Sequence, residues 1–209
     1  MIFTQDDIKS LEQRYRATFI NSLAGFKQAV LVGTISTNGH SNLAIFNSIL
    51  HIGANPAMYG LLFRPDTVKR DTLTNILDSK VYTLNYVPTS DYEKAHQTSA
   101  KYETTISEFT AVGFTEQFTQ NCKAPFVQEA VVKIGMQLEE RIDIKINGTI
   151  LLIGSLQYIE MADNLVHRDG FVALEKAGVL ACTGLDAYYS TQLLGRLSYA
   201  RPDKWPGII

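Results

Sequence analysis

The sequence of 209 residues contains few of the residues that build disulfide or metal sites. Its two cysteines, Cys122 and Cys182, are too few and too far apart in the sequence for a disulfide framework or for the closely spaced pairs of a zinc site. No apolar run approaches the ~20 residues that a transmembrane helix needs. The first 16 residues carry three acidic side chains where a signal peptide would need a basic start and an apolar run. We therefore expect a soluble, cytoplasmic protein with reduced thiols.

Motifs of several common catalytic sites are also missing. The sequence has no Gly-x-Gly-x-x-Gly, no P-loop, no Gly-x-Ser-x-Gly elbow and no His-Glu-x-x-His. The histidines do not have the spacing of metal ligands, and we interpret them as surface or turn residues. The roles of two of them, His51 and His96, stay open. The other two are His40 and His167. The sequence therefore predicts no catalytic side-chain constellation and no metal site.

The charge of the chain is nearly balanced. Lys and Arg number 19 and Asp and Glu number 21, a net charge of −2, so no overall field would attract a polyanion or an anionic membrane. We predict neither nucleic acid nor membrane as a partner. The apolar fraction of 45% suits one globular domain over residues 1–209, and 21 aromatic residues with 14 glycines favour strands and turns.

Hydrophobic patterns predict a helix at the start of the chain and a β-hairpin after it. Residues 5–19 have apolar side chains three and four apart, which predicts one amphipathic helix whose apolar stripe packs on the body. Two apolar runs, 29–35 and 41–50, flank Asn38-Gly39, a strong hairpin signal because both turn positions need positive φ. A third strand is predicted over 58–63. These three strands are close in sequence, and we expect them to be antiparallel.

The rest of the chain predicts further antiparallel strands. A second hairpin joins 141–146 to 149–159 through Asn147-Gly148, and three alternating isoleucines in its first arm predict one buried face. Strands over 80–87 and 131–138 bring the total to at least six. The fold class is therefore mainly β with short helices, an antiparallel, Greek-key-like, closed or nearly closed barrel. Three segments lie outside it: an N-terminal helix (1–20), a helical insertion (89–118) that is a candidate lid, and a C-terminal tail (186–209).

Anion-binding side chains are concentrated after the third predicted strand. Arg64, Lys69 and Arg70 supply three positive charges. Hydroxyl and amide donors accompany them at Thr67, Thr72 and Asn75. A helix capped by Asp71 or Thr72 would direct its backbone N–H groups toward the same place, which suits one phosphate. The alternative is a solvated loop that leads into a capped helix.

Polar side chains also interrupt the second arm of the first hairpin. Asn42, Asn47 and Ser48 are unusual in an otherwise apolar arm unless something polar and flat docks on it. The alternative is an edge strand whose polar face meets water.

These residues together resemble the flavin reductase-like family of FMN-binding split-barrel proteins. The resemblance spans about residues 20–200 and depends on the order and spacing of short segments. The segments are Asn42-x-Ala44-x-Phe46-x-Ser48, the Asn55-Pro56 break, Arg64, Arg70-Asp71-Thr72-x-x-Asn75-Ile76 and the strand from Tyr82 to Asn85. Looser agreement continues through 108–114, 131–139, Asn147-Gly148 and 194–199.

The resemblance implies bound FMN, with NAD(P)H as a co-substrate. Residues of the first hairpin would line the flavin ring and ribityl chain: Asn42, Ala44, Phe46, Asn47 and Ser48. Residues after the third strand would hold the ribityl phosphate: Arg64, Thr67, Arg70, Asp71 and Thr72. Asn85 would be a lesser contact. The chain departs from the family pattern at Ile45, where Pro is common, at Asn47, where Ser is common, and at Arg70, where Lys is common.

Three interpretations of the function stay open. The first is an FMN-dependent NAD(P)H oxidoreductase that reduces free flavin or a protein acceptor by hydride transfer through flavin N5. The second is an FMN-binding electron-transfer or carrier protein that does not oxidise NAD(P)H, and the third is a barrel without flavin. Glu108, Tyr102 and His96 are candidate substrate contacts. Because the strands are too apolar for the outside of a monomer, we also expect a homodimer that buries part of one sheet.

Overall fold

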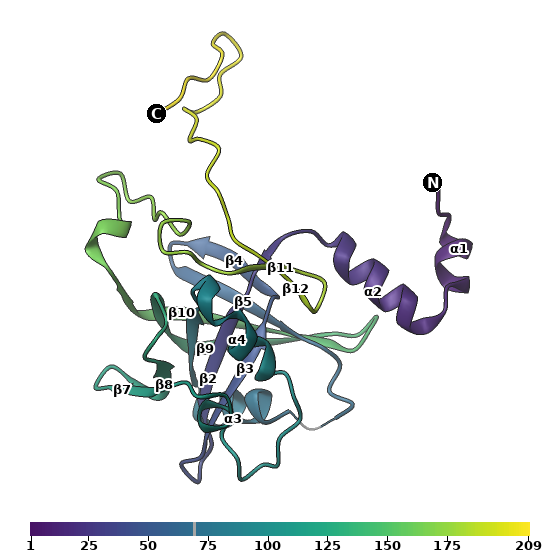
Figure 1. The fold of residues 1–209 in the computed structure, drawn as a ribbon, viewed down its shortest axis with the longest axis vertical. Helices are drawn as coiled ribbons and strands as arrows, with labels where there is room; N and C mark the ends of the chain where they lie inside the picture. Colours follow the sequence, from purple (N-terminus) through teal and green to yellow (C-terminus); the bar gives the residue numbers. More distant parts are fainter. Residues whose placement is uncertain (69) are drawn as a thin grey trace.

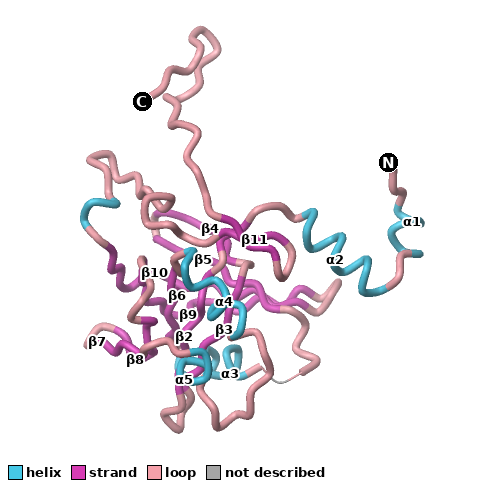
Figure 2. Tube along the Cα trace, in the orientation of Figure 1, coloured by secondary structure: helices cyan, strands magenta, loops and turns pink. Residues whose placement is uncertain are grey.

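The structure is a computed structural model that describes residues 1–68 and 70–209 (Figure 1). The helices are α1 (Gln5–Ser10), α2 (Gln13–Leu23), α3 (Asp71–Ser79), α4 (Tyr92–Gln97) and α5 (Glu108–Val112), with turns of 3-10 helix at Thr89–Asp91 and Asp163–Leu165. The strands are β1 (Lys27–Gln28), β2 (Val30–Ile35), β3 (Ser41–Phe46), β4 (Ile49–Ala54), β5 (Ala57–Phe63), β6 (Val81–Tyr86), β7 (Glu116–Thr119), β8 (Cys122–Val127), β9 (Val132–Ile144), β10 (Thr149–Met161), β11 (Ala181–Thr183) and β12 (Ala187–Tyr189). Figure 2 shows that strands form the body and that short helices lie around it.

The main sheet is antiparallel, and its two outer strands follow one another in the chain. Its order is β3-β2-β6-β9-β10-β5-β4, so β3 and β4 are the two outer strands. Only Asn47 and Ser48 separate these strands in the chain. The backbone carbonyl of Ser48 accepts the Leu62 N–H of β5 at 3.0 Å, and its hydroxyl donates to the Leu62 carbonyl at 2.7 Å. These bonds extend the β4–β5 pairing back to the junction, so the chain passes directly from one outer strand of the sheet to the other. The predicted antiparallel, nearly closed barrel is confirmed.

Both predicted Asn-Gly hairpins are present. β2 pairs with β3, with Val32 opposite Ala44, and β9 pairs with β10. The turn glycines Gly39 and Gly148 have φ values of 81° and 73°, but the asparagines before them do not have positive φ. The prediction of two left-handed turn positions is therefore wrong, because both turns are longer than two residues and need only the glycine in that conformation.

The third predicted strand lies in another part of the sheet. β5 pairs with β4 and β10, not with the β2–β3 hairpin. The apolar run 41–50, predicted as one arm, is two strands, because the chain leaves β3 and enters β4 at Asn47 and Ser48. The polar residues of that arm thus mark a junction between strands.

Two layers of apolar side chains hold this junction in place. The barrel interior packs Val32, Phe63 and Leu152 together with Leu73 and Ile76 of α3, which therefore closes one end of the barrel. A second core lies between β2, β3 and the insertion.

The insertion 89–118 is packed on the sheet. Ala95 of α4 and Phe109 of α5 are buried against Leu31 of β2 and Leu43 of β3. The predicted helices of this segment are confirmed, and they cover the outer face of the first hairpin.

β8 crosses β2 at very close range. A Cβ atom at Gly33 would lie 2.2 Å from the Pro125 carbonyl oxygen and 2.5 Å from Thr83 Oγ1. Thr83 Oγ1 donates to that same carbonyl at 2.7 Å. Position 33 therefore needs glycine because of space.

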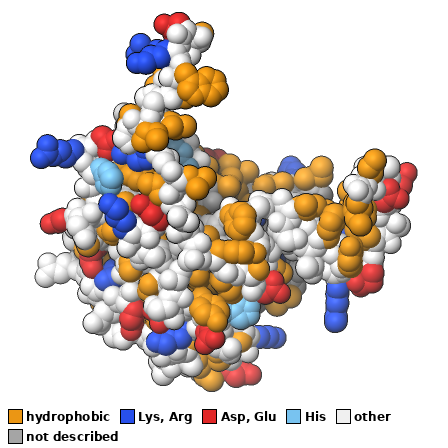
Figure 3. Space-filling view, turned by 45° about the horizontal axis from the view of Figure 1, so that its top comes forward, with side chains coloured by type: hydrophobic (Ala, Val, Ile, Leu, Met, Phe, Trp, Pro, Cys, Tyr) orange, Lys and Arg blue, Asp and Glu red, His pale blue; other side chains and the backbone are white. Residues whose placement is uncertain are grey.

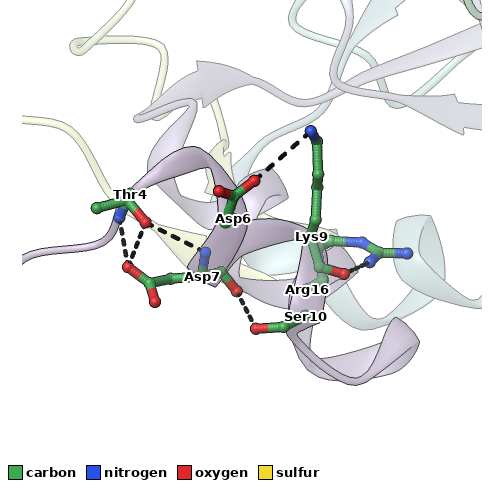
Figure 4. A network of polar contacts seen from close by, with 6 residues as sticks. All are labelled: Thr4, Asp6, Asp7, Lys9, Ser10 and Arg16. Atoms are coloured by element: carbon green, nitrogen blue, oxygen red, sulfur yellow. Dashed lines mark hydrogen bonds and ion pairs between the residues drawn. The ribbon is translucent and has the colours of Figure 1, made fainter.

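The N-terminal segment is two helices with a corner between them. α1 ends at Ser10, and Leu11 is extended with ψ of 141°. Figure 4 shows why the corner is stable: Thr4 and Asp7 form a capping box at the start of α1, and an Arg16 guanidinium N–H donates to the Lys9 carbonyl at 2.9 Å. Neither helix buries a residue, and both project from the barrel (Figure 1), so the prediction of one helix packed on the body is wrong.

The tip of the β9–β10 hairpin also extends beyond the barrel. Ile142 and Ile146 are 38% and 94% exposed, so the predicted buried face is wrong at this end. β5 pairs with β10 only from Ile150 onward, and β6 pairs with β9 only up to Gln137, so no neighbouring strand covers the tip.

The predicted tail 186–209 starts within a small sheet. β12 pairs with β11, which pairs with β1, and the chain then leaves the body as an arm (Figure 1). Among the described residues, no helix combines the length and apolar character that crossing a membrane requires.

Candidate functional site

The strand β3 carries the first group of predicted site residues. Asn42, Ala44 and Phe46 alternate along the strand, so their side chains lie on one face. Phe46 is half-buried and meets Phe63 of β5 edge to face, with ring centroids 5.0 Å apart. Leu43, on the opposite face, is buried beneath the insertion. β3 is therefore held on both faces.

The structure brings β3 next to the start of α3. The Asn42 side-chain amide donates to Thr72 Oγ1 at 3.0 Å. One turn further along α3, the Asn75 amide donates to Thr34 Oγ1 of β2 at 3.1 Å, and both of these residues are buried. The two segments that the sequence analysis singled out separately therefore form one neighbourhood.

The start of α3 has the general features of an anion site. Arg70 precedes the helix in an extended conformation, and Asp71 is the first helical residue. The first N–H groups of a helix have no acceptor within it, and the helix dipole favours an anion there. The predicted side-chain cap by Asp71 or Thr72 is wrong: Arg70 occupies the cap position and makes no capping hydrogen bond.

Arg70 has a buried donor without an acceptor in the part of the chain that the structure describes. Its Nε atom is buried and makes no hydrogen bond to any described residue. A buried guanidinium N–H without a partner is costly, so an oxyanion bound here would remove that cost. Arg64 and Thr67 lie exposed on the loop before α3, and Lys69, the third predicted positive charge, lies outside the described residues.

Glu108 brings the insertion into the same neighbourhood. Its carboxylate accepts the backbone N–H of Leu43 on β3 at 2.9 Å. Burial raises the pKa of Glu108, the hydrogen bond from Leu43 opposes this, and the negative charge of Asp71 raises the pKa further. The carboxylates of Glu108 and Asp71 thus lie near each other beside β3. Because both would repel an anion, the favourable side for one is that of Arg70. The sequence suggests Glu108 only as a candidate substrate contact, and no local pattern indicates its bond to Leu43.

Asn47 joins the first hairpin to the β11–β12 turn. Its side-chain amide donates to the Gly184 carbonyl at 2.6 Å, across 137 positions of sequence. Its amide also lowers the pKa of the Cys182 thiol, which burial raises more strongly. At least one Asn47 donor that was assigned to a flavin ring therefore has a partner within the protein.

His96 and Tyr188 form a pair at the edge of this region. His96 Nδ1 and the Tyr188 hydroxyl are 2.8 Å apart, which links α4 to β12. Tyr188 lies opposite Cys182 in the β11–β12 pairing, and burial raises its pKa to about 12. Sequence spacing does not indicate this pair, because 92 positions separate its members.

Asn85 does not join the site. It is fully buried, its amide donates to the Leu31 carbonyl and to Thr83, and its side-chain oxygen accepts the Val127 N–H. These bonds tie β6 to β2 and β8, so we assign Asn85 to the barrel wall.

The remaining histidines lie apart from one another. His51 is exposed on β4 beside Tyr59, and His40 and His167 are in turns. Among the described residues, no three His, Cys, Asp or Glu side chains come together as a metal site would require.

The donors around the start of α3 fit a phosphate monoester. One buried guanidinium N–H, the Thr72 hydroxyl and the Asn42 amide lie around a helix N-terminus. The half-buried face of Ala44 and Phe46 continues from this point along β3. A group with a phosphate at one end and a flat ring at the other, as in FMN, matches that arrangement.

Comparisons with known proteins identify the family of the chain. A family model described as flavin reductase like domain matches residues 23–175. A solved structure described as a flavin reductase with split barrel domain, from Shewanella frigidimarina, is 44% identical, with 96% of this chain and 100% of that chain covered and a TM-score of 0.92.

More distant structures share the fold. Nitrilotriacetate monooxygenase component B from Bacillus cereus is 16% identical, with 94% of this chain and 98% of that chain covered and a TM-score of 0.83. Flavoredoxin of Desulfovibrio vulgaris is 17% identical, with 85% and 91% covered and a TM-score of 0.70. At these identities the likeness supports the split barrel alone. Since the family model covers most of the sequence, this chain belongs to the flavin reductase-like family.

Proposed function

We propose that this protein is an FMN-binding oxidoreductase that takes a hydride from NAD(P)H and passes the electrons to a free flavin or a protein acceptor. The observation that carries the proposal is the buried Arg70 Nε, which has no acceptor among the described residues and lies at the start of α3. Membership of the flavin reductase-like family supports the same activity.

The residues of this chain bind and orient the cofactor. Arg70 would hold the ribityl phosphate with the Thr72 hydroxyl and the N-terminus of α3, and Arg64, Thr67 and Asp71 would surround it. Asn42, Ala44, Phe46, Asn47 and Ser48 would line the ring and ribityl chain along β3. Bound FMN supplies hydride and electron transfer at its N5 position.

No titrating side chain needs to perform the chemistry. Asn42 is fixed by Thr72, and Asn47 is fixed by Gly184, so their amide dipoles are oriented before any ligand binds. Oriented amides stabilise developing negative charge without a proton transfer of their own. We further propose that the protein is a cytoplasmic homodimer, and that the nicotinamide stacks on the exposed face of the flavin.

The test is an FMN titration followed by anaerobic reduction. The purified protein is expected to bind FMN, and its visible absorbance is expected to bleach with NADH or NADPH. Bleaching with one nucleotide only would identify the preferred nicotinamide.

Two results would contradict the proposal in different ways. Absence of FMN binding would remove both flavin interpretations and leave a barrel without flavin. Binding without bleaching by either nucleotide would instead support an electron-transfer or carrier protein.

A further inference from the structure

The C-terminal arm, residues 194–209, is held to the body only at its base. The Arg196 guanidinium forms an ion pair with Asp169 and lies over the Phe171 ring, 4.2 Å from its centroid. Beyond Arg196, backbone bonds fold the arm into a small hairpin, with Ser198 N–H donating to the Gly207 carbonyl at 2.9 Å. Among the described residues, no hydrogen bond or ion pair joins 197–209 to residues before Arg196.

This hairpin exposes an unusual amount of apolar surface. Tyr199 and Trp205 are each 90% exposed, and Trp205 is the single tryptophan of the chain. Four aliphatic side chains are exposed with them: Leu194, Leu197, Ile208 and Ile209. Figure 3 shows hydrophobic side chains on the arm standing clear of the body. An isolated two-stranded hairpin is marginally stable in water, so an ordered arm of this composition requires a covering surface.

The area involved matches a symmetric pair of chains. The two aromatic side chains carry roughly 300–500 Å², and each aliphatic one roughly 100 Å². Two arms exchanged between two copies would therefore supply much of the about 1,200–2,000 Å² that a specific interface buries. The same chain also offers exposed apolar residues elsewhere, among them Ile20 and Leu23 of α2.

Charge also favours a second copy as the partner. Because Arg196 is paired with Asp169 of its own body, the charge of the hairpin 197–209 comes from Arg201 and Lys204 against Asp203. Its side chains have a net charge of +1, and those of residues 1–196 carry −3 of the chain total of −2. The arm of one copy is thus attracted to the body of another.

We propose that the C-terminal arm binds the body of a second copy of this chain, with the two copies exchanging arms. The contact is additional to the sheet-to-sheet dimer that the apolar strands predict, and it does not depend on flavin binding. Tyr199 and Trp205 are its anchors, because large aromatic side chains dominate such interfaces.

Trp205 reports directly on this contact. Tryptophan fluorescence and quenching by acrylamide are measured on the full chain across a dilution series, beside sedimentation equilibrium. We expect a dimer in which Trp205 has blue-shifted emission and is protected from quencher, and we expect both properties to disappear as the dimer dissociates on dilution. Emission from a fully quenchable Trp205 in the dimer would overturn the proposal, and so would a monomer at every concentration.

Substitutions locate the contact. Tyr199→Ala keeps the fluorescent probe and is expected to weaken the dimer by at least about 30-fold, and Trp205→Ala, followed by sedimentation, is expected to do the same. The matched control is Ile146→Ala, which removes an equally exposed apolar side chain from the β9–β10 tip. An effect of the control equal to that of the arm variants, or no effect of either arm variant, would overturn the proposal.

The same experiments distinguish a second copy of the chain from a lipid surface as the partner of the arm. If the protein is a monomer and its Trp205 emission shifts only when anionic vesicles are added, the partner of the arm is a lipid surface and the proposal of a second copy is wrong. In an FMN titration, Tyr199→Ala is expected to bind as much FMN per chain as the unmodified protein, with the same affinity. The arm contact and flavin binding can therefore fail separately.

Discussion

Around β2 and β8 the barrel is packed so closely that one methyl group does not fit at Gly33, whereas the C-terminal arm leaves Tyr199 and Trp205 almost fully exposed. Asn85, fully buried in the barrel wall, has hydrogen bonds with three residues. In the arm, bonds beyond Arg196 run within the hairpin alone. The barrel therefore gains its order from its own contacts, and the arm needs another surface.

The candidate site lies between these two extremes. Asn42, Thr72 and Glu108 have partners within the chain, while Arg70 Nε has none among the described residues. A cofactor site needs a rigid wall that fixes the position of the ligand and a donor that is free to bind it. The candidate site offers both, because its other side chains are held within the chain and Arg70 Nε can donate to the cofactor.

The largest effect is expected where the barrel is tightest. Gly33→Ala would push a Cβ into the Pro125 carbonyl and Thr83 Oγ1, and we expect the free energy of unfolding to fall by about 3 kcal/mol. The matched control is Gly195→Ala in the arm, where a Cβ would meet no heavy atom of a described residue within 4 Å and φ is not positive. Chemical denaturation of both variants measures the difference. Equal stabilities would show that β2 and β8 can separate at low cost.

The next effect is expected at the unsatisfied donor. Arg70→Ala would remove a charged hydrogen bond to the phosphate, which is worth about 1.5–3 kcal/mol, so FMN affinity should fall roughly 10- to 100-fold. Arg168→Ala, which removes an exposed arginine from a turn, should leave the affinity unchanged. Fluorescence titration of FMN measures both, and equal affinities for the two variants would remove the phosphate assignment. Thr72→Val tests the hydroxyl at the same site. We choose valine over alanine because Thr72 is buried and valine keeps the shape of the side chain.

Local signals in the sequence predicted the barrel well. Asn38-Gly39 and Asn147-Gly148 mark the two hairpins because turn glycines with positive φ are a local requirement. The sequence does not indicate the position of β5 between β4 and β10, because strand order depends on contacts between distant segments. Periodicity failed for residues 5–19 and for Ile142 and Ile146, since an apolar pattern shows which side chains are available for burial and does not supply a covering surface.

The candidate site was predicted only in part, for a similar reason. Arg70 and Thr72, which we propose as anion-binding residues, share one short segment, so the composition of that segment suggests its chemistry. The bonds from Asn42 to Thr72, from Glu108 to Leu43 and from Asn47 to Gly184 join positions 30, 65 and 137 apart. No spacing rule indicates such pairs, and Asn85, predicted as a contact, is in the wall because of three bonds of this kind.

The smallest effect is expected at Glu108, where the insertion meets the site. The folded state raises the pKa of Glu108 above its ordinary value of 4.5 through burial and the charge of Asp71, so the folded protein binds this proton more tightly than the unfolded chain does. The ionised side chain therefore lowers stability at neutral pH, and this penalty is relieved as the pH falls through the folded pKa toward 4.5. Glu108→Gln keeps an acceptor for the Leu43 N–H without the charge.

We therefore expect Glu108→Gln to melt at a higher temperature than the unmodified protein at pH 7, with the difference shrinking as the pH approaches 4.5. Thermal unfolding across that range measures it. Glu103→Gln, which changes an exposed carboxylate of the same insertion, is the control and should show no such trend. A difference that stays constant with pH would mean that folding does not raise the pKa of Glu108, and that the side chain affects stability through its shape alone.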